Sequence, residues 1–400
     1  MKVLQVNNVY ADKSTGKITQ VVHEGLLADG WESVVVYGRG RTVTAPGVIR
    51  LCPNWYGKAN NLLSRVTGMP FGGCLLSTWR LMSIIRQEKP DVVHLQCING
   101  YFVNIYRLIR WLKKNKIKTV VSLHAEFMYT ANCGHAFSCD QWKKGCKKCP
   151  NAKKVVKSWF FDRTGRSWQR MREAFRGFEE DCVVAPVSPW AEERAKMGDI
   201  LKEFPFRTVY NGIEEKNTFC RPVEQTPERA VLQVTAHFNT EPDHPKGGYY
   251  VAELAKRMPD VAFYVAGRAD GQLDLPENVQ LLGHLRDQKA LADWYRRVKV
   301  SVLTSKRETF SMPCAESLCC GTPVVGFKAG APEQIAMEDY SEFVEFGDLD
   351  GLEKALRDWL DREDLNREDL ACQAAKVYGA DAMIRNFERV YEECNEAKKV

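Results

Sequence analysis

The sequence of 400 residues lacks any long apolar run. No stretch approaches the roughly 20 apolar residues that a membrane-spanning helix needs. The opening residues, MKVLQVNNVY, lack the long apolar core of a secretory signal peptide. We therefore expect the protein to be made and kept in the cytoplasm. In that reducing compartment its 14 cysteines should not form a disulfide framework.

The chain also lacks a strong charge imbalance, a short repeat and a dinucleotide-binding fingerprint. Its net charge of +6 is mild and does not by itself imply a nucleic-acid partner. The turn at Ser14-Thr15-Gly16-Lys17 is not GxGxxG, so dinucleotide binding of the usual type is unsupported. An apolar content of 44% is ample for buried cores, and this length favours two domains.

Short apolar runs alternate with helical patterns along the chain. Strands are predicted at 2–7, 34–37, 92–95, 119–123, 182–187, 206–210, 231–235, 261–266 and 300–303. This alternation predicts an α/β protein with two parallel, doubly wound sheets covered by helices.

We place a first domain at residues 1–212 and a second at 213–379. The last helix, 380–400, is expected to pack back on the first domain. The polar segment 214–229 is predicted to be a linker, and 57–73 an irregular, mobile loop.

Two glutamates flank a predicted helix start at the end of a strand. Glu308 lies in the loop after the strand 300–303, and Glu316 lies eight residues later, just inside the helix. Ser311 is predicted to cap that helix. Helix amides suit a phosphate and carboxylates suit hydroxyls, so a nucleotide sugar would satisfy both. Solvated acids in a first helical turn explain the spacing equally well.

This stretch and several others together resemble the retaining GT-B glycosyltransferases of family 4, also called glycosyl transferases group 1. The resemblance covers nearly the whole chain, and Ser14-Thr15-Gly16-Lys17-Ile18 with His124 is similar to the bacterial capsule, exopolysaccharide and colanic-acid branch. The other motifs that carry it are Asn211-Gly212-Ile213, Lys246-Gly247, Val265-Ala266-Gly267, and Glu308-x7-Glu316 followed by Gly321-Thr322-Pro323-Val324-Val325.

The resemblance implies two Rossmann-like domains facing across a cleft, with the acceptor on the N-terminal side and the donor on the C-terminal side. It implies that Glu316 accepts hydrogen bonds from the ribose and that Glu308 contacts the transferred sugar. The remaining implied donor contacts are Lys246 with the diphosphate, the amides of Phe310, Ser311 and Met312, the glycines Gly16 and Gly267, and His124 at the sugar. Glu308, His124 and Lys246 are the implied catalytic residues.

The sequence departs from the family pattern in two places. The family usually has an Arg shortly before the Lys, whereas this strand ends Thr235-Ala236-His237-Phe238. Either His237 replaces that Arg or the diphosphate has one cationic contact fewer, and Arg268 is another nearby charge. An Asp often follows the strand-end His in this branch, but residue 125 is Ala.

The implied reaction is transfer of a hexose-type sugar, with retention, from a UDP- or GDP-sugar to a lipid-linked or growing glycan of a bacterial surface polysaccharide. No DxD-like motif stands at a strand end beside Glu308, so no cofactor or metal is expected for the chemistry. The alternatives are a GT-B nucleotide-sugar epimerase and a non-enzymatic, zinc-containing RNA-binding or scaffold protein. The latter would leave Glu308, Glu316 and Lys246 unexplained.

A cysteine cluster occupies the segment 133–149. Cys133, Cys139, Cys146 and Cys149 could close a structural zinc site, although free thiols or a redox pair are the alternatives.

A basic stretch follows from Lys143 to Arg176, with Trp142, Trp159, Phe160, Phe161 and Trp168 interleaved. It suits the inner membrane surface, a phosphate-rich RNA, or an ordinary solvated face over core aromatics. With a lipid-linked acceptor the membrane is favoured, and we expect no nucleic-acid partner.

Overall fold

The computed structural model describes residues 1–150, 152–155, 157–213, 218–219, 226–271 and 273–396. The chain divides into two compact units, Met1–Tyr210 with Met383–Val400, and Asn211–Ala382. The assignment of acceptor and donor roles to the two halves stays a prediction.

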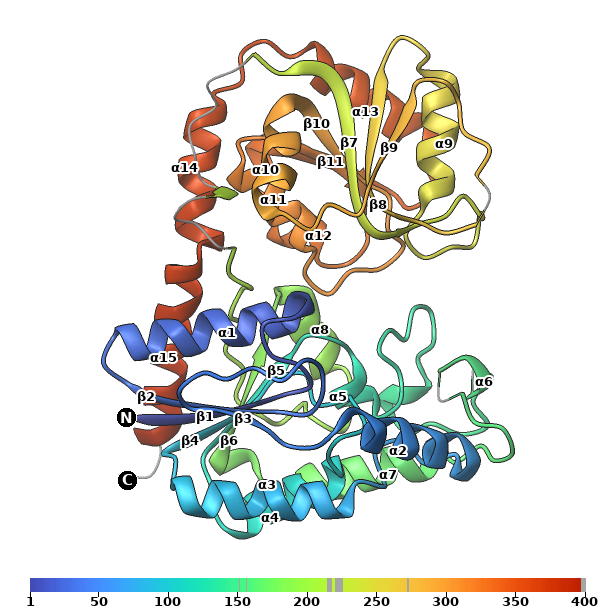
Figure 1. The fold of residues 1–400 in the computed structure, drawn as a ribbon. Coiled ribbons are helices and arrows are strands. Elements are labelled where there is room, and N and C mark those ends of the chain that lie inside the picture. The colour runs from blue at the N-terminus through green and yellow to red at the C-terminus, as the bar shows by residue number, and fades with distance from the viewer. Residues whose placement is uncertain (151, 156, 214–217, 220–225, 272, 397–400) are drawn as a thin grey trace. The chain divides into compact units, whose positions relative to one another are not determined.

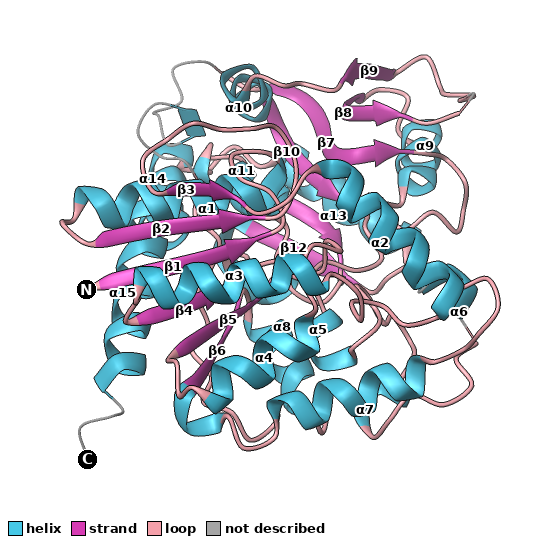
Figure 2. Ribbon diagram, turned by 60° about the horizontal axis from the view of Figure 1, so that its bottom comes forward, coloured by secondary structure: helices cyan, strands magenta, loops and turns pink. Residues whose placement is uncertain are grey.

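The N-terminal unit is built on a six-stranded sheet in the order β3-β2-β1-β4-β5-β6 (Figures 1 and 2). Every pairing in it is parallel. Helices cover both faces of this sheet, so its central strands are nearly continuous apolar runs. Strand β4 is buried at every position. The strands are β1 Lys2–Asn7, β2 Glu32–Tyr37, β3 Val48–Arg50, β4 Val92–Leu95, β5 Thr119–Leu123 and β6 Cys182–Pro186.

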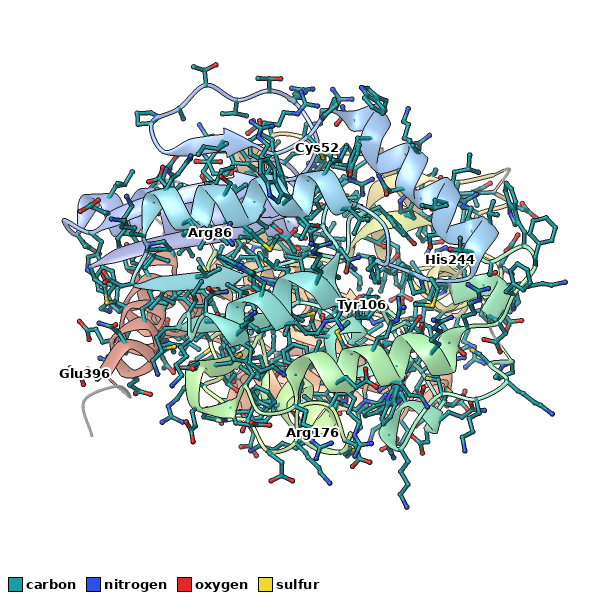
Figure 3. The ribbon with its side chains drawn as sticks, turned by 90° about the horizontal axis from the view of Figure 1, so that it is seen from below. Cys52, Arg86, Tyr106, Arg176, His244 and Glu396 are labelled. Carbon is teal, nitrogen blue, oxygen red and sulfur yellow. The ribbon has the colours of Figure 1, made fainter. Side chains whose placement is uncertain are left out.

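Amphipathic helices cover this sheet. In α4 the buried residues Ile105, Leu108, Ile109 and Leu112 recur at helical spacing and form one apolar stripe. Tyr106 of the same helix, labelled in Figure 3, is buried. Its hydroxyl donates to Pro70 O at 2.9 Å. The α-helices are α1 Lys13–Ala28, α2 Asn54–Thr67, α3 Leu75–Glu88, α4 Ile105–Lys114, α5 Phe127–Thr130, α6 Ala152–Val155, α7 Thr164–Phe175 and α8 Pro189–Lys196.

The last helix, α15 (Ala380–Glu396), belongs for most of its length to the N-terminal unit. Tyr391 is fully buried there, stacks on Phe387 and shares a 2.7 Å hydrogen bond with His94 Nδ1 of β4. Ser122 Oγ lies 2.8 Å from the other ring nitrogen of His94. Burial lowers the pKa of His94 to about 3, so the ring is neutral at physiological pH.

The C-terminal unit repeats the plan, with a six-stranded sheet in the order β12-β11-β10-β7-β8-β9. Renumbered from its own first strand, this is the same order as in the N-terminal sheet. The strands are β7 Glu228–Phe238, β8 Ala262–Ala269, β9 Val279–Gly283, β10 Val298–Leu303, β11 Val324–Phe327 and β12 Ser341–Val344. The helices are α9 Gly248–Arg257, α10 Gln288–Arg297, α11 Met312–Cys319, α12 Pro332–Ile335, α13 Leu349–Asp361 and α14 Arg367–Tyr378.

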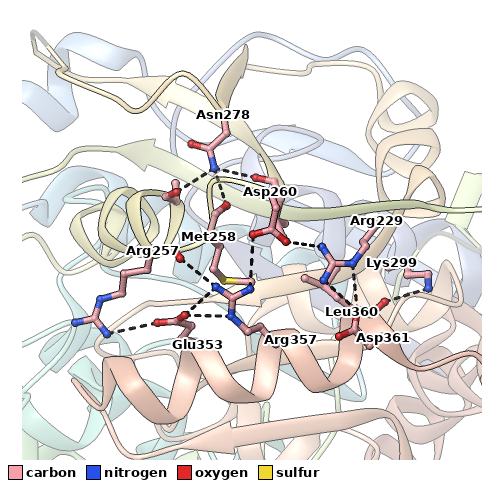
Figure 4. A network of polar contacts seen from close by, with 12 residues as sticks. Arg229, Arg257, Met258, Asp260, Asn278, Lys299, Glu353, Arg357, Leu360 and Asp361 are labelled. Atoms are coloured by element: carbon pink, nitrogen blue, oxygen red, sulfur yellow. Dashed lines mark hydrogen bonds and ion pairs between the residues drawn. The ribbon is translucent and has the colours of Figure 1, made fainter.

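A network of arginines and carboxylates ties α13 to the starts of β7 and β8 (Figure 4). Arg229 bonds Asp260 and Asp361, both at 3.0 Å, and Arg357 bonds Glu353 of its own helix. These groups are partly solvent-exposed, so each pair adds little to stability.

Two predicted elements differ from the observed ones, and a third lies mostly outside the described residues. Residues 57–73 do not form an irregular loop, because α2 occupies most of them. That helix buries Gly57 and Ser64, whereas its large apolar side chains are exposed. The apolar residues in the sequence therefore did not mark the side of the helix that packs on the unit. The predicted strand at 206–210 makes one bridge to β6 and no regular strand. The predicted linker at 214–229 lies mostly outside the described residues, and β7 begins at Glu228.

Within the described parts of the chain, no helix combines the length and apolar character that crossing a membrane requires. The expected doubly wound α/β architecture is confirmed in both units.

Candidate active site

The central feature of the C-terminal unit is an ion pair at the carboxyl end of its sheet. Lys246 Nζ lies 2.7 Å from Glu308 Oε1, and the two side chains are 34% and 21% exposed. Lys246 precedes α9, and Glu308 follows β10. The structure therefore brings together two of the predicted site residues that are 62 positions apart.

The turn that carries Lys246 is held by buried polar contacts. Gln233 of β7 donates to Thr304 Oγ1 at 2.7 Å, and Thr304 donates to the carbonyl of Lys246 at 3.2 Å. Gly247 has φ 66°, and a Cβ there would stand 2.0 Å from Thr304 O. Only glycine permits both this conformation and this close approach.

The loop of Glu308 is held from its other side. Its amide donates to Ala329 O at 3.0 Å, and it forms a parallel bridge with Gly330. Glu333 in α12 accepts hydrogen bonds from the amides of Ala329 and Gly330 at 2.9 Å. These contacts fix the backbone around Glu308 and leave its carboxylate on Lys246.

Helix α11 begins directly after this loop, at Met312. Ser311 stands at the capping position with φ 77° and makes no side-chain capping bond, so its predicted capping role is wrong. Its left-handed backbone instead turns the chain into the helix, while Phe310 packs in the interior. The dipole of α11 places partial positive charge at Met312, four residues after Glu308.

Glu316 lies one turn inside α11 and is half-buried. Its Oε2 accepts a hydrogen bond from Tyr295 of α10 at 3.1 Å. Burial raises the pKa of Tyr295 well above its usual value, so this hydroxyl stays protonated and donates. Tyr295 therefore fixes one carboxylate oxygen of Glu316.

The ends of β7 and β8 carry the two other predicted cations. His237 and Arg268 are register partners in the parallel pairing. Both converge on Asp270, with His237 Nδ1 at 2.7 Å and Arg268 Nε at 3.8 Å from its carboxylate. Gly267 packs against Thr235, whose carbonyl would lie 2.3 Å from an added Cβ.

In the N-terminal unit, Gly16 lies in the first turn of α1 rather than in a loop before it. Its carbonyl accepts from the amide of Ala11 at 3.0 Å. Asn7, at the end of β1, donates to the carbonyls of Val9 at 2.9 Å and Thr15 at 3.1 Å. One buried amide side chain therefore holds both sides of the segment that leads into α1.

His124 follows β5 and ends a chain of buried amides. Its Nε2 lies 2.7 Å from Gln96 Oε1, Gln96 Nε2 donates to Gln5 Oε1 at 3.0 Å, and Gln5 Nε2 lies 3.4 Å from Thr19 O. A backbone carbonyl can only accept, so the direction of every bond in this chain is set from Thr19. His124 must then carry its proton on Nε2.

Burial lowers the pKa of His124 to about 4. The ring is therefore neutral at physiological pH, with Nδ1 as its unprotonated, accepting nitrogen. Such a ring can accept a hydrogen bond from a hydroxyl but carries no charge for a phosphate.

The four clustered cysteines lie in the loops between α5 and α7. Cys133 and Cys146 are buried, and burial, reinforced by neighbouring thiols, raises the pKa of each to about 12. Among the residues that the structure describes, no three His, Cys, Asp or Glu side chains are placed to share a metal ion. This arrangement gives the zinc site no geometric support, and that site stays a prediction.

The aromatic residues of the basic stretch fall into a buried group and an exposed group. Trp142 and Trp168 are 1% and 4% exposed and belong to the core of the N-terminal unit. Trp159, Phe160 and Phe161 are 53%, 70% and 51% exposed. Only the second group is available to a partner.

Part of the C-terminal unit matches a known protein family. Residues 250–362, which hold Glu308, α11 and Glu316, match the model of the glycosyl transferases group 1 family. The chain carries a glycosyl transferases group 1 domain. It is 24% identical over 356 residues to the putative colanic acid biosynthesis glycosyl transferase WcaC of Escherichia coli (strain K12), covering 84% of this chain and 85% of that protein. The protein is a glycosyltransferase.

Solved structures share the fold of this glycosyltransferase at low sequence identity. Sucrose-phosphate synthase from Thermosynechococcus elongatus matches with a TM-score of 0.66 and 13% identity over 99% of this chain and all of that one. Anabaena HepE in complex with UDP-glucose matches with a TM-score of 0.59 and 12% identity over 98% of this chain and all of that one. The predicted GT-B fold is confirmed.

Several residues that build the site escaped the sequence prediction. They share one feature, which is a side-chain hydrogen bond or ion pair that fixes a segment of the site. They are Asn7, Gln96, Gln233, Asp270, Tyr295 and Glu333. Only Gln96 and Gln233 gave a signal, since a glutamine in or just after an apolar strand must find a buried partner.

Proposed function

We propose that this glycosyltransferase moves a hexose-type sugar from a UDP- or GDP-sugar to a lipid-linked or growing glycan of a bacterial surface polysaccharide, with retention at the anomeric carbon. The observation that carries the proposal is the Lys246–Glu308 pair beside the start of α11. An ammonium, a helix N-terminus and a carboxylate together suit a diphosphate joined to a sugar.

In this proposal, Lys246 leaves Glu308 and pairs with the diphosphate when the donor binds. Because the Lys246–Glu308 pair is partly exposed, breaking it costs little. The diphosphate takes the ammonium, and the Glu308 carboxylate turns to the sugar hydroxyls. Glu316, which accepts a hydrogen bond from Tyr295, also accepts from the ribose hydroxyls.

The chemistry then follows from charge. The bond between the anomeric carbon and the β-phosphate oxygen breaks, and an acceptor oxygen forms the new bond on the same face of the sugar. Negative charge grows on the leaving diphosphate, where Lys246 and the α11 amides stabilise it. The departing phosphate oxygen takes the proton of the acceptor hydroxyl. Neutral His124 accepts a hydrogen bond from a hydroxyl of the transferred sugar.

Two relatives support the choice of substrates. HepE is described in complex with UDP and with UDP-glucose, and WcaC is described as a putative colanic acid biosynthesis enzyme. A lipid-linked acceptor would place the enzyme on the inner face of the plasma membrane.

The direct test is a thermal-shift panel of UDP- and GDP-sugars, followed by transfer assays with the best binder. We expect one nucleotide sugar to raise the melting temperature, and the product formed from it to keep the donor's anomeric configuration by NMR. Absence of any shift across the panel would refute the proposal. A product of inverted configuration would refute retention alone.

A further inference from the structure

The exposed apolar side chains of the described residues are concentrated in one part of the N-terminal unit. Fifteen large apolar side chains are exposed among those residues, and ten of them come from α2, the start of α3 and the segment before α7. We call these ten the apolar face: Trp55, Leu62, Leu63, Val66, Leu75, Leu76, Trp79, Trp159, Phe160 and Phe161.

Hydrogen bonds and close contacts show that the three segments adjoin. The amide of Trp159 donates to Arg65 O in α2 at 2.9 Å. Gly68, with φ 67°, ends α2 so close to Phe161 that an added Cβ would stand 2.3 Å from the Phe161 carbonyl. On the other side, Asn60 of α2 accepts from the amide of Cys74, directly before α3, at 2.7 Å. Helix α2, labelled in Figure 2, therefore contacts both of the other segments.

The segments that carry the apolar face are rich in basic residues and contain few acids. No Asp or Glu occurs between Glu32 and Glu88, the stretch that contains α2 and the start of α3. Asp162 is the sole acid between Lys153 and Arg172, and its carboxylate is already engaged by the amides of Cys149 and Thr164. The basic residues between Glu32 and Glu88 are Arg39, Arg41, Arg50, Lys58, Arg65, Arg80 and Arg86.

The segment before α7 carries exposed aromatic rings and basic side chains next to each other. Arg163 lies over the ring of Phe161, with its guanidinium carbon 4.9 Å from the ring centroid. Phe160 contacts its neighbours Trp159 and Phe161 edge-on or tilted, so the three rings project as a cluster. Lys157, two residues before Trp159, is exposed.

We infer that the apolar face docks on an anionic lipid bilayer. Exposed Trp and Phe rings beside Lys and Arg are the composition of segments that lie at the boundary between headgroups and acyl chains. The apolar rings insert among the acyl chains, while the cations bind acidic headgroups. A second copy of this chain is the weaker occupant, because it would bring two basic faces together.

The inference deepens the proposed function by specifying how the enzyme meets a lipid-linked acceptor, and it rests on that function only for this purpose. Docking requires no donor and no chemistry. Vesicle binding and sugar transfer are therefore separate measurements, and either can fail without the other.

The test is co-sedimentation of the full chain with vesicles of phosphatidylcholine alone or mixed with phosphatidylglycerol. The variant Leu76→Ser/Trp159→Ser/Phe160→Ser removes three apolar side chains that are 75%, 53% and 70% exposed. The matched control Met197→Ser/Leu281→Ser/Val377→Ser removes three exposed apolar side chains elsewhere. Neither triple variant changes the net charge, and both should keep the wild-type melting temperature because all six sites are exposed.

We expect the wild type and the control to bind the anionic vesicles, and the face variant to bind at least about tenfold more weakly. Salt at about 0.5 M should weaken the wild-type binding, because screening shortens the reach of the headgroup charge. Equal binding by all three proteins would overturn the inference, as would equal binding of the wild type to neutral and anionic vesicles. A dimer that the face variant abolishes, with no vesicle binding, would assign the face to a second copy instead.

Discussion

Replacing Gln96 tests the chain of hydrogen bonds that sets the protonation of His124. Gln96 is fully buried between Gln5 and His124, with bonds of 3.0 and 2.7 Å. In Gln96→Glu the carboxylate still accepts from His124 Nε2 but adds a negative charge next to the ring. A charge at that distance favours the imidazolium, so the pKa of His124 should rise from about 4 by at least about one unit.

Gln96→Met is the matched variant, since it keeps the length of the side chain and removes both hydrogen bonds. It strands Gln5 Oε1 and the Nε2–H of His124 in the interior. Each unpaired buried group costs about 1–3 kcal/mol, so the free energy of unfolding should fall by about 2–6 kcal/mol. The pKa of His124 should stay low, because burial remains its cause.

Nitrogen NMR of histidine-labelled protein reads both properties directly. The wild-type His124 should show a protonated Nε2 and an unprotonated Nδ1 from pH 6 to 8. A proton on Nδ1 in the wild type would refute the assignment before any variant is made. An unchanged pKa in Gln96→Glu would show that Gln96 does not face the ring as the structure places it.

Three further predictions concern the ion pair, the turn beside it and a buried ring. Lys246→Met should weaken the binding of UDP or GDP by about 10- to 100-fold, because a charge-assisted bond to phosphate is lost. Titration calorimetry should show unchanged binding of the free nucleoside. Equal losses for the nucleotide and the nucleoside would place Lys246 away from the diphosphate. Gly247→Ala should lower the free energy of unfolding in urea by at least about 2 kcal/mol, because it combines φ 66° with a clash against Thr304; wild-type stability would contradict the close approach. His94 has a folded pKa of about 3, so below a pH of about 6.5 the unfolded form binds its proton first, and His94 should lower the free energy of unfolding by up to about 1.4 kcal/mol per pH unit. His94→Gln should reduce the measured slope in urea titrations by that contribution and leave the contribution of His124, whose pKa is also lowered. An unchanged slope would exclude a contribution from His94.

Patterns local in the chain allowed much of the fold to be predicted. The apolar periodicity predicts the alternation of buried strands and helices, and β1, β4 and β5 have the predicted bounds. Helix α2 was not predicted, because its apolar residues do not mark its packed side. Its Leu62, Leu63 and Val66 face outward, whereas packing falls to Gly57 and Ser64, so periodicity carried no information about its core side.

The candidate site was predicted as residues but not as contacts. Glu308 and Lys246 were named separately, and their 2.7 Å pairing depends on two strands meeting at one sheet edge. Tyr295 and Gln96 act through partners 21 and 28 residues away, and neither partner follows from local spacing. Ser311 shows the limit of a local rule, because its position is that of a cap while its backbone is left-handed and its side chain does not cap.

The most direct test of the central claim is calorimetric titration of the full chain with UDP- and GDP-sugars, beside Glu316→Gln and the exposed control Glu338→Gln. One nucleotide sugar should bind at one site per chain. Glu316→Gln should weaken that binding by about 10- to 100-fold, since a charge-assisted bond is worth about 1.5–3 kcal/mol, while Glu338→Gln should not. Wild-type affinity in Glu316→Gln, or no binding of any nucleotide sugar, would contradict the account.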